Sequence, residues 1–152
     1  MNGIEILHGL KVEDRYRWLE DTTSEKTKQW ITLQNEQTEK FLQSLPYRHR
    51  FRHRIEQLWD YVRCSCPVKA GRRYFFMKNH GLQNQPVLYF KESWDAEPRV
   101  LLDPNAWNAE GTTAIYVWQP SHEGELLAYG VSEKGSDWQT IRVVNVHRGQ
   151  IC

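Results

Sequence analysis

Residues 73–91 have the sequence RYFFMKNHGLQNQPVLYFK, and this stretch decides the fold of the second half of the chain. Its two ends, Arg73–Asn79 and Pro86–Lys91, are rich in the aromatic and β-branched residues that are typical of strands. The residues between them include Gly81 and several polar side chains, a composition that favours a reversal of the chain. The stretch therefore predicts two antiparallel strands joined by a turn.

Further strand-like runs surround this pair. Cys64–Lys69 precedes it and Arg99–Leu102 follows it, and a second set lies about 40 residues along the chain at Ala114–Gln119, Glu125–Val131 and Gln139–Val146. Two sets at this spacing predict repeated four-stranded sheets, as in the blades of a β-propeller. Because the second set shows three strands and a propeller needs at least about four blades, we expect an incomplete propeller and a truncated chain.

The first third of the chain predicts helices instead. No Gly or Pro occurs from Ser24 to Leu45, and Thr22 with Glu25 has the form of a capping box. An apolar stripe interrupted by Gln37 occupies one face, and its members are Trp30, Leu33, Phe41 and Leu45.

Pro46 separates this segment from a second predicted helix, Tyr47–Asp60. The apolar stripe of the second helix consists of Phe51, Ile55, Leu58 and Trp59. The change from helical to strand periodicity places a domain boundary near Val62.

Composition excludes several classes of protein. The 152 residues are 39% hydrophobic and 12% aromatic, which disfavours disorder, and the net charge of +1 disfavours nucleic-acid binding. The amino terminus lacks the basic and then apolar pattern of a secretory signal, and no apolar run reaches the roughly 18 residues of a membrane span. We expect a cytosolic protein with no membrane partner.

Cysteine and histidine do not form a recognisable site. The three cysteines, Cys64, Cys66 and Cys152, are an odd number and do not support a disulfide framework, so we expect reduced thiols. His49, His53 and His80 do not complete a finger-like zinc pattern, and we predict neither a metal nor an organic cofactor. The basic cluster between Arg48 and Arg54 could contact phosphate or RNA, although a solvated helix face explains it better in a nearly neutral chain.

Four strings of residues, in the same order along the chain, resemble signatures of the prolyl oligopeptidase (prolyl endopeptidase) family of serine peptidases. Their positions are Asp14–Asp21 (DRYRWLED), Gly81–Tyr89 (GLQNQPVLY), Leu102–Asn105 (LDPN) and Gly135–Trp138 (GSDW). Two positions depart from the family pattern: Arg15 stands where the family has Pro, and Glu123 replaces a common Asp in a blade turn. Both departures concern structure more than chemistry, because one frees a backbone dihedral and the other changes a turn residue.

The resemblance implies an α+β fragment of a two-domain enzyme, in which an α/β-hydrolase domain is covered by a seven-bladed propeller. Residues 1–62 would be the amino-terminal helical segment that packs on the hydrolase domain, and residues 63–152 would be blade one and most of blade two. The family consists of cytosolic, mostly monomeric serine endopeptidases that hydrolyse short proline-containing peptides after proline. Its catalytic and substrate-binding residues lie in parts of the protein beyond the resemblance.

No catalytic constellation is predicted in this chain. A nucleophile elbow needs small residues around the serine, and Ser136 is followed by Asp137 and Trp138. Surface roles are expected for the histidines in predicted turns and strand ends, which are His8, His80, His122 and His147. Glu20 and Asp21 belong to the first signature string, where capping or pairing near the first helix is the expected role.

We therefore predict that the chain is inactive alone and contains no catalytic, cofactor-binding or metal-binding residue. An alternative is a truncated paralogue or splice form that acts as a protein-interaction module through its exposed helices and strand edges.

Overall fold

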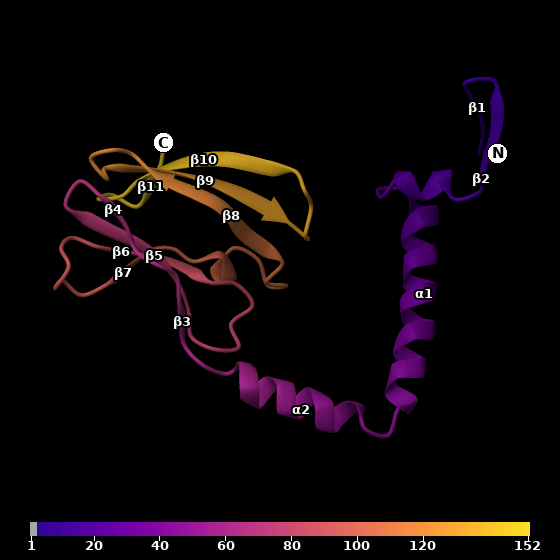
Figure 1. Ribbon diagram of the computed structural model, residues 1–152, viewed down its shortest axis with the longest axis horizontal. Helices are drawn as coiled ribbons and strands as arrows, with labels where there is room; N and C mark the ends of the chain where they lie inside the picture. The colour runs from indigo at the N-terminus through magenta and orange to yellow at the C-terminus, as the bar shows by residue number, and fades with distance from the viewer. Residues whose placement is uncertain (1–2) are drawn as a thin grey trace. The chain divides into compact units, whose positions relative to one another are not determined.

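A computed structural model describes residues 3–152 of the chain (Figure 1). Contacts divide the chain into two compact units, residues 1–53 and residues 54–152. This division falls inside helix α2 (Arg48–Trp59), whereas the change of sequence period predicts a domain boundary at residue 62. The predicted domain boundary stays a prediction.

The first unit opens with a hairpin that the sequence analysis did not predict. Strands β1 (Gly3–Leu7) and β2 (Leu10–Asp14) are antiparallel, and the connecting residues His8 and Gly9 have φ angles of 52° and 83°. Positive φ at both positions gives the two-residue turn whose twist matches that of the strands. Ile6 and Leu10 are 75% and 72% exposed, so the hairpin lacks the buried face that makes a strand recognisable from its pattern.

A 3-10 turn, η1 (Arg17–Glu20), leads into the long helix α1 (Glu25–Ser44). The predicted capping box of Thr22 and Glu25 is wrong, because Ser24 is the N-cap and its Oγ accepts a hydrogen bond from the N–H of Thr27 at 3.2 Å. The start is displaced because the Asp21 carboxylate closes a turn by accepting the N–H and the hydroxyl of Thr23.

Helix α1 ends before Pro46, and α2 follows it, close to the predicted bounds. The apolar stripes that define the two helices are largely exposed. Phe41 is 65% exposed, and the exposed fractions of Phe51 and Ile55 on α2 are 69% and 58%. No other part of residues 3–152 therefore buries most of the apolar side chains of these two stripes.

The first sheet contains residues 73–91, which form two of its strands and the turn between them. Its strands are β3 (Arg63–Cys64), β4 (Val68–Ala70), β5 (Arg73–Asn79), β6 (Val87–Lys91) and β7 (Arg99–Leu102), and both β3 and β4 pair with β5. The single strand predicted at Cys64–Lys69 is interrupted because Pro67 has no N–H to donate. Ser65 bridges the interruption, since its N–H donates to the Met77 carbonyl and its Oγ accepts the Met77 N–H, both at 2.9 Å.

The second sheet is an antiparallel meander in the order β11-β10-β9-β8. Its strands are β8 (Thr113–Pro120), β9 (Leu126–Glu133), β10 (Gln139–Asn145) and β11 (Gln150–Ile151), and the 3-10 turn η2 (Pro104–Ala106) precedes them. The expectation of three strands was wrong, because the two residues of β11 pair with Val144 and Asn145 as a short fourth strand. A two-residue strand has no period, which is why the pattern missed it.

The core of the second unit lies between the two sheets (Figure 1). Buried apolar side chains from both sheets form one cluster, with Phe75, Leu88 and Phe90 from the first and Leu127, Tyr129 and Val144 from the second. Phe75, Leu88, Leu127 and Val144 are all fully buried. The two sheets thus pack face to face as consecutive propeller blades do.

Candidate functional site

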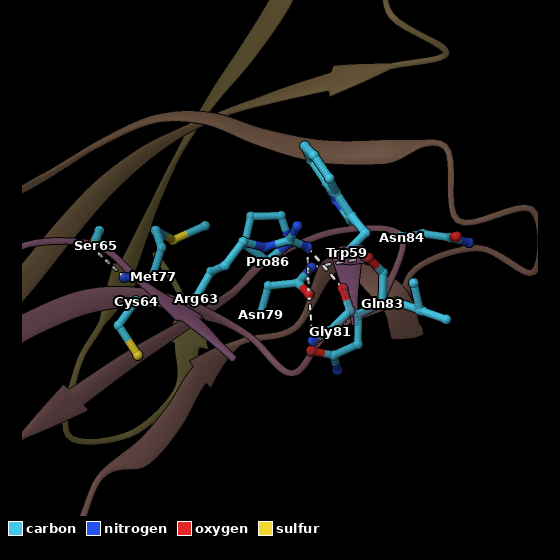
Figure 2. A pocket seen from close by; sticks show the side chains of 11 residues that line it. Trp59, Arg63, Cys64, Ser65, Met77, Asn79, Gly81, Gln83, Asn84 and Pro86 are labelled. Carbon is cyan, nitrogen blue, oxygen red and sulfur yellow. Dashed lines mark hydrogen bonds between the residues drawn. The ribbon is translucent and has the colours of Figure 1, made fainter. Parts of the chain in front are cut away.

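A pocket opens where the end of α2 meets the first sheet (Figure 2). It has a volume of about 690 Å³, and its lining comes from Trp59, from the strands around Arg63 and Met77, and from the turn of residues 79–86. All of these residues belong to the second unit. The pocket is therefore formed by the second of the four signature strings together with the residues that lead into the sheet.

Arg63 is the charged side chain at the centre of this pocket. Its Nη2 donates to the Asn79 Oδ1 at 3.1 Å and to the Gly81 carbonyl at 2.8 Å, as the dashed lines in Figure 2 show. The guanidinium also lies over two aromatic rings, 5.1 Å from the Trp59 centroid and 5.5 Å from the Tyr61 centroid. Sequence reasoning did not single out Arg63, because its partners are brought to it only by the turn.

Asn79 organises the turn that accepts Arg63. Its Oδ1 also accepts the Gly81 N–H at 2.9 Å, and its Nδ2 donates to the Gln83 carbonyl at 2.9 Å. The Gln83 side chain closes the turn from the other side by accepting the His80 N–H at 2.8 Å. The string GLQNQ thus encodes a hydrogen-bonded turn that the Gln83 side chain helps to close.

The second and third signature strings meet in space. The Gln85 N–H donates to the Asn105 Oδ1, and the Asn105 Nδ2 donates back to the Gln85 carbonyl, both at 2.9 Å. The Gln85 side chain donates to the Gly111 carbonyl at 3.1 Å, on the segment that leads into the second sheet. These strings therefore join the first sheet to the chain that enters the second.

At another contact between the sheets, Arg73 bridges the two. Its Nε lies 2.9 Å from the Glu92 Oε2, and its Nη1 donates to the Gly124 carbonyl at 2.9 Å. Arg73 is only 8% exposed. The turn it contacts contains Glu123, the residue that departs from the family pattern, and the turn still closes through the Gly124 N–H to the Ser121 carbonyl at 2.9 Å.

The first signature string has structural partners in the first unit. Arg17 makes a two-pronged contact with Glu5 at 2.9 and 2.8 Å, and the Trp18 ring packs edge-on against Trp30. The pKa of Asp21 is lowered, first by the hydrogen bond from the Thr23 hydroxyl and then by the Thr23 N–H. Asp21 pairs with Thr23 in the turn before α1 and does not cap the helix, whose N-cap is Ser24. Arg15 is an exposed residue whose guanidinium lies 3.7 Å from Glu13.

The fourth signature string forms a turn between β9 and β10, as its sequence predicts. The Ser136 Oγ accepts the Trp138 N–H at 3.1 Å, and the Ser136 carbonyl accepts the Ser132 hydroxyl at 2.6 Å. A strand-to-strand turn differs from the strand-to-helix elbow of a hydrolase nucleophile. The arrangement gives Ser136 a turn-closing role.

The predicted surface histidines lie in turns or just beyond strands. His8 is in the β1–β2 turn, His122 and His147 are in turns of the second sheet, and His80 follows β5 with its Nε2 3.4 Å from the Tyr89 hydroxyl. The three cysteines are free and exposed. Among residues 3–152, no group of three or more His, Cys, Asp or Glu side chains is arranged to hold a metal ion. None of the described helices is long and apolar enough to cross a membrane.

Two antiparallel sheets that pack face to face and are joined by the second and third signature strings have the arrangement of consecutive blades in a β-propeller domain. Residues 2–152 match the family described as "Prolyl oligopeptidase, N-terminal beta-propeller domain". The chain belongs to this family. The resemblance drawn from the four strings is thereby confirmed.

Relatives of known name agree with this assignment. The prolyl endopeptidase of Elizabethkingia miricola is 37% identical over 145 residues, which are 95% of this chain and 20% of the relative. That of Elizabethkingia meningoseptica is 39% identical over 137 residues, which are 90% of this chain and 19% of the relative. The chain thus spans about a fifth of the length of the curated relatives it matches.

Solved structures show the same fold. One from a study of two prolyl endopeptidases superposes on all of this chain with a TM-score of 0.85 and 29% identity, and the match covers 22% of that structure. Prolyl oligopeptidase B from Galerina marginata, bound to a 35mer hydrolysis and macrocyclization substrate, matches 91% of this chain and 21% of its own with a TM-score of 0.70 and 26% identity.

Proposed function

We propose that this chain is the amino-terminal part of a serine peptidase that hydrolyses short peptides after proline. Support comes from the family match over residues 2–152 and from relatives named prolyl endopeptidase, of which the chain covers about a fifth. In this proposal the two sheets begin a propeller that admits peptides to a catalytic domain formed by other residues. The triad, the oxyanion hole and the proline-binding residues then belong to that domain, and the chain alone does not catalyse hydrolysis.

The observation that carries the proposal is the family match over residues 2–152, and the exposure of the helical stripes adds structural support. Phe41, Phe51, Ile55 and Leu58 are each more than half exposed, although their spacing is that of a buried helix face. Large apolar side chains at such spacing mark a surface that another part of a protein covers. We infer that the peptidase domain of the longer enzyme covers each of the two stripes, and that the helices support that domain.

The direct test is a chimera. Residues 1–152 replace the matching segment of the Elizabethkingia miricola prolyl endopeptidase, and hydrolysis of a fluorogenic peptide with proline before the cleaved bond is measured. We expect the chimera to be active and residues 1–152 alone to be inactive. A folded chimera without activity toward the proline peptide, or hydrolysis by residues 1–152 alone, would contradict the proposal.

A pair of variants in the same chimera tests the role of the helical stripe. Phe51→Asp places a charge on the apolar face, so we expect lower activity and a lower melting temperature of the chimera. Gln29→Asp introduces the same charge at an exposed polar position near the start of α1 and should leave both unchanged. Equal effects of the two variants would show that the stripe is not a packing surface.

We also propose that the enzyme is cytosolic and needs no cofactor. The free, exposed thiols of Cys64, Cys66 and Cys152 support a reducing compartment. Labelling of the three thiols in intact cells, followed by fractionation, tests this location. Recovery of disulfide-bonded protein from a secreted fraction would contradict it.

A further inference from the structure

The passage from α2 into the first sheet is short. Residues 60–62 separate Trp59, at the end of α2, from Arg63, the first residue of β3. A connection of this length can be a flexible pivot or a fixed joint. The contacts of Trp59, Asp60, Tyr61 and Arg63 show whether the connection is flexible or fixed. All of these residues lie within the second unit.

On the helix side, aromatic rings fix the Arg63 guanidinium. Trp59 and Tyr61 precede it by four and two residues, and their ring centroids lie 5.1 and 5.5 Å from its central carbon. A planar guanidinium stacked on rings loses little additional freedom when it forms hydrogen bonds. The donor is therefore preorganised by the same segment that leads out of the helix.

On the sheet side, both acceptors belong to one turn. Arg63 Nη2 reaches the Asn79 Oδ1 at 3.1 Å and the Gly81 carbonyl at 2.8 Å. Asn79 is 6% exposed, and its amide also binds the Gly81 N–H and the Gln83 carbonyl. Because the acceptor is itself held by the turn, Arg63 attaches the connection to a rigid element.

A steric contact adds to these bonds. An ideal Cβ at residue 81 would overlap the Asp60 Oδ1, and Gly81 has a φ of +116°. Side chains rarely adopt this φ, so the backbone conformation itself requires glycine at position 81. The Asp60 carboxylate fills the space that this glycine leaves beside the turn.

We propose that Arg63 is a positioning residue that locks the end of α2 onto the 79–83 turn and makes residues 60–62 a rigid joint. Any movement of the last turn of α2 relative to the first sheet then requires the Arg63 hydrogen bonds to break. The joint does not depend on peptidase activity. Its test therefore needs no substrate and can fail or succeed independently of the proposed function.

Amide hydrogen exchange of the 152-residue chain tests the joint. In Arg63→Ala we expect the Gly81 N–H and the amides of residues 57–63 to exchange about tenfold faster, because about one net hydrogen bond or more to the turn is lost. Arg63→Lys should give a smaller increase than Arg63→Ala, since an ammonium can donate to the same two acceptors but lacks the planar guanidinium that lies over the rings. Amides of β9, in the other sheet, should be unaffected in both variants.

Arg99→Lys, an exposed position of the same sheet, is the control and should change no amide by more than about twofold. Three results would overturn the proposal. They are an absence of Gly81 protection in the wild-type chain, unchanged exchange in Arg63→Ala, and equal acceleration of β9, which would indicate a general loss of stability.

A second pair of variants tests the steric contact without changing Arg63. Gly81→Ala and Gly135→Ala both place a side chain at positive φ, +116° and +72°, but a Cβ at position 135 meets no atom within 4 Å. We expect Gly81→Ala alone to accelerate exchange at residues 57–63. If Gly135→Ala accelerates it equally, the effect is a general loss of stability and not a local change at the 79–83 turn, and the joint is refuted.

Discussion

Asn105 pairs with the backbone of Gln85 in both directions, accepting its N–H and donating to its carbonyl at 2.9 Å each. The Asn105 side-chain amide thus forms the same two hydrogen bonds with Gln85 that the backbone of a neighbouring strand would form. The same Nδ2 also lies 2.9 Å from the Asp103 Oδ1, so the pairing is anchored within its own turn. This single side chain joins two signature strings through residues that are 20 positions apart in the sequence.

Removal of this side chain should destabilise the second unit. We expect Asn105→Ala to lower the free energy of unfolding by about 2 kcal/mol, because partly buried backbone groups of Gln85 lose their partner. Pulse proteolysis in urea measures the change. Asn35→Ala, on the exposed surface of α1, is the control, and a loss at position 105 no larger than at position 35 would refute the role of the pair.

Arg72 and Arg73 form a natural comparison, because both approach the Glu92 carboxylate. Arg73 is buried and lies 2.9 Å from it, whereas the Arg72 side chain is 82% exposed and lies 3.9 Å away. We expect Arg73→Met to cost about 3 kcal/mol of unfolding free energy, since the Glu92 carboxylate and the Gly124 carbonyl both lose their donor.

Arg72→Met should cost less than about 0.5 kcal/mol in the same measurement, as is usual for exposed ion pairs. Similar losses of unfolding free energy in the two variants would contradict this account. They would show that any positive charge near Glu92 stabilises the fold equally, whether or not it is buried between the sheets.

Glycine at position 124 is required by contact between the sheets. A Cβ there would lie 2.5 Å from the Ala70 carbonyl oxygen, while one at Gly149, which has nearly the same φ, would meet no atom within 4 Å. We expect Gly149→Ala to cost about 1 kcal/mol from backbone strain and Gly124→Ala to cost about 2 kcal/mol more, because the turn must move away from the first sheet. Urea unfolding of both variants checks this, and equal losses would contradict the close approach.

The Asp21 carboxyl should titrate at a lower pH than an ordinary aspartate, since Thr23 donates two hydrogen bonds to it and lowers its pKa. A carboxyl with a lower pKa in the folded state stabilises that state above its unfolded pKa, and the contribution is lost as pH falls through the folded pKa. Thr23→Val should raise the pKa of Asp21 in an NMR titration, whereas Thr32→Val should not. An Asp21 pKa that is insensitive to Thr23→Val would contradict this assignment.

Sequence patterns predicted the elements with a buried face or an uninterrupted period. Helix α1 and strands β5, β6, β8, β9 and β10 lie close to their predicted bounds. The β1–β2 hairpin was missed because its apolar residues are exposed. The break between β3 and β4 was missed because a proline interrupts a strand only where the neighbouring strand, here β5, would accept its N–H.

The candidate site was predictable in part. The strings that contain Gln85 and Asn105 were recognisable, but their mutual hydrogen bonds depend on a turn that brings residues 20 positions apart together. Arg63 gave no signal, because its acceptors lie 16 and 18 positions away in the sequence. Such long-range pairings are properties of the fold and not of local composition.

The size of the native product tests the central claim that this chain is part of a longer peptidase. An antibody against residues 25–44, which form α1, is used in an immunoblot of the native protein, and the detected band is analysed by mass spectrometry. We predict a product several-fold larger than 18.1 kDa that copurifies with cleavage after proline. A product of 18.1 kDa alone would contradict the claim and would favour an interaction module.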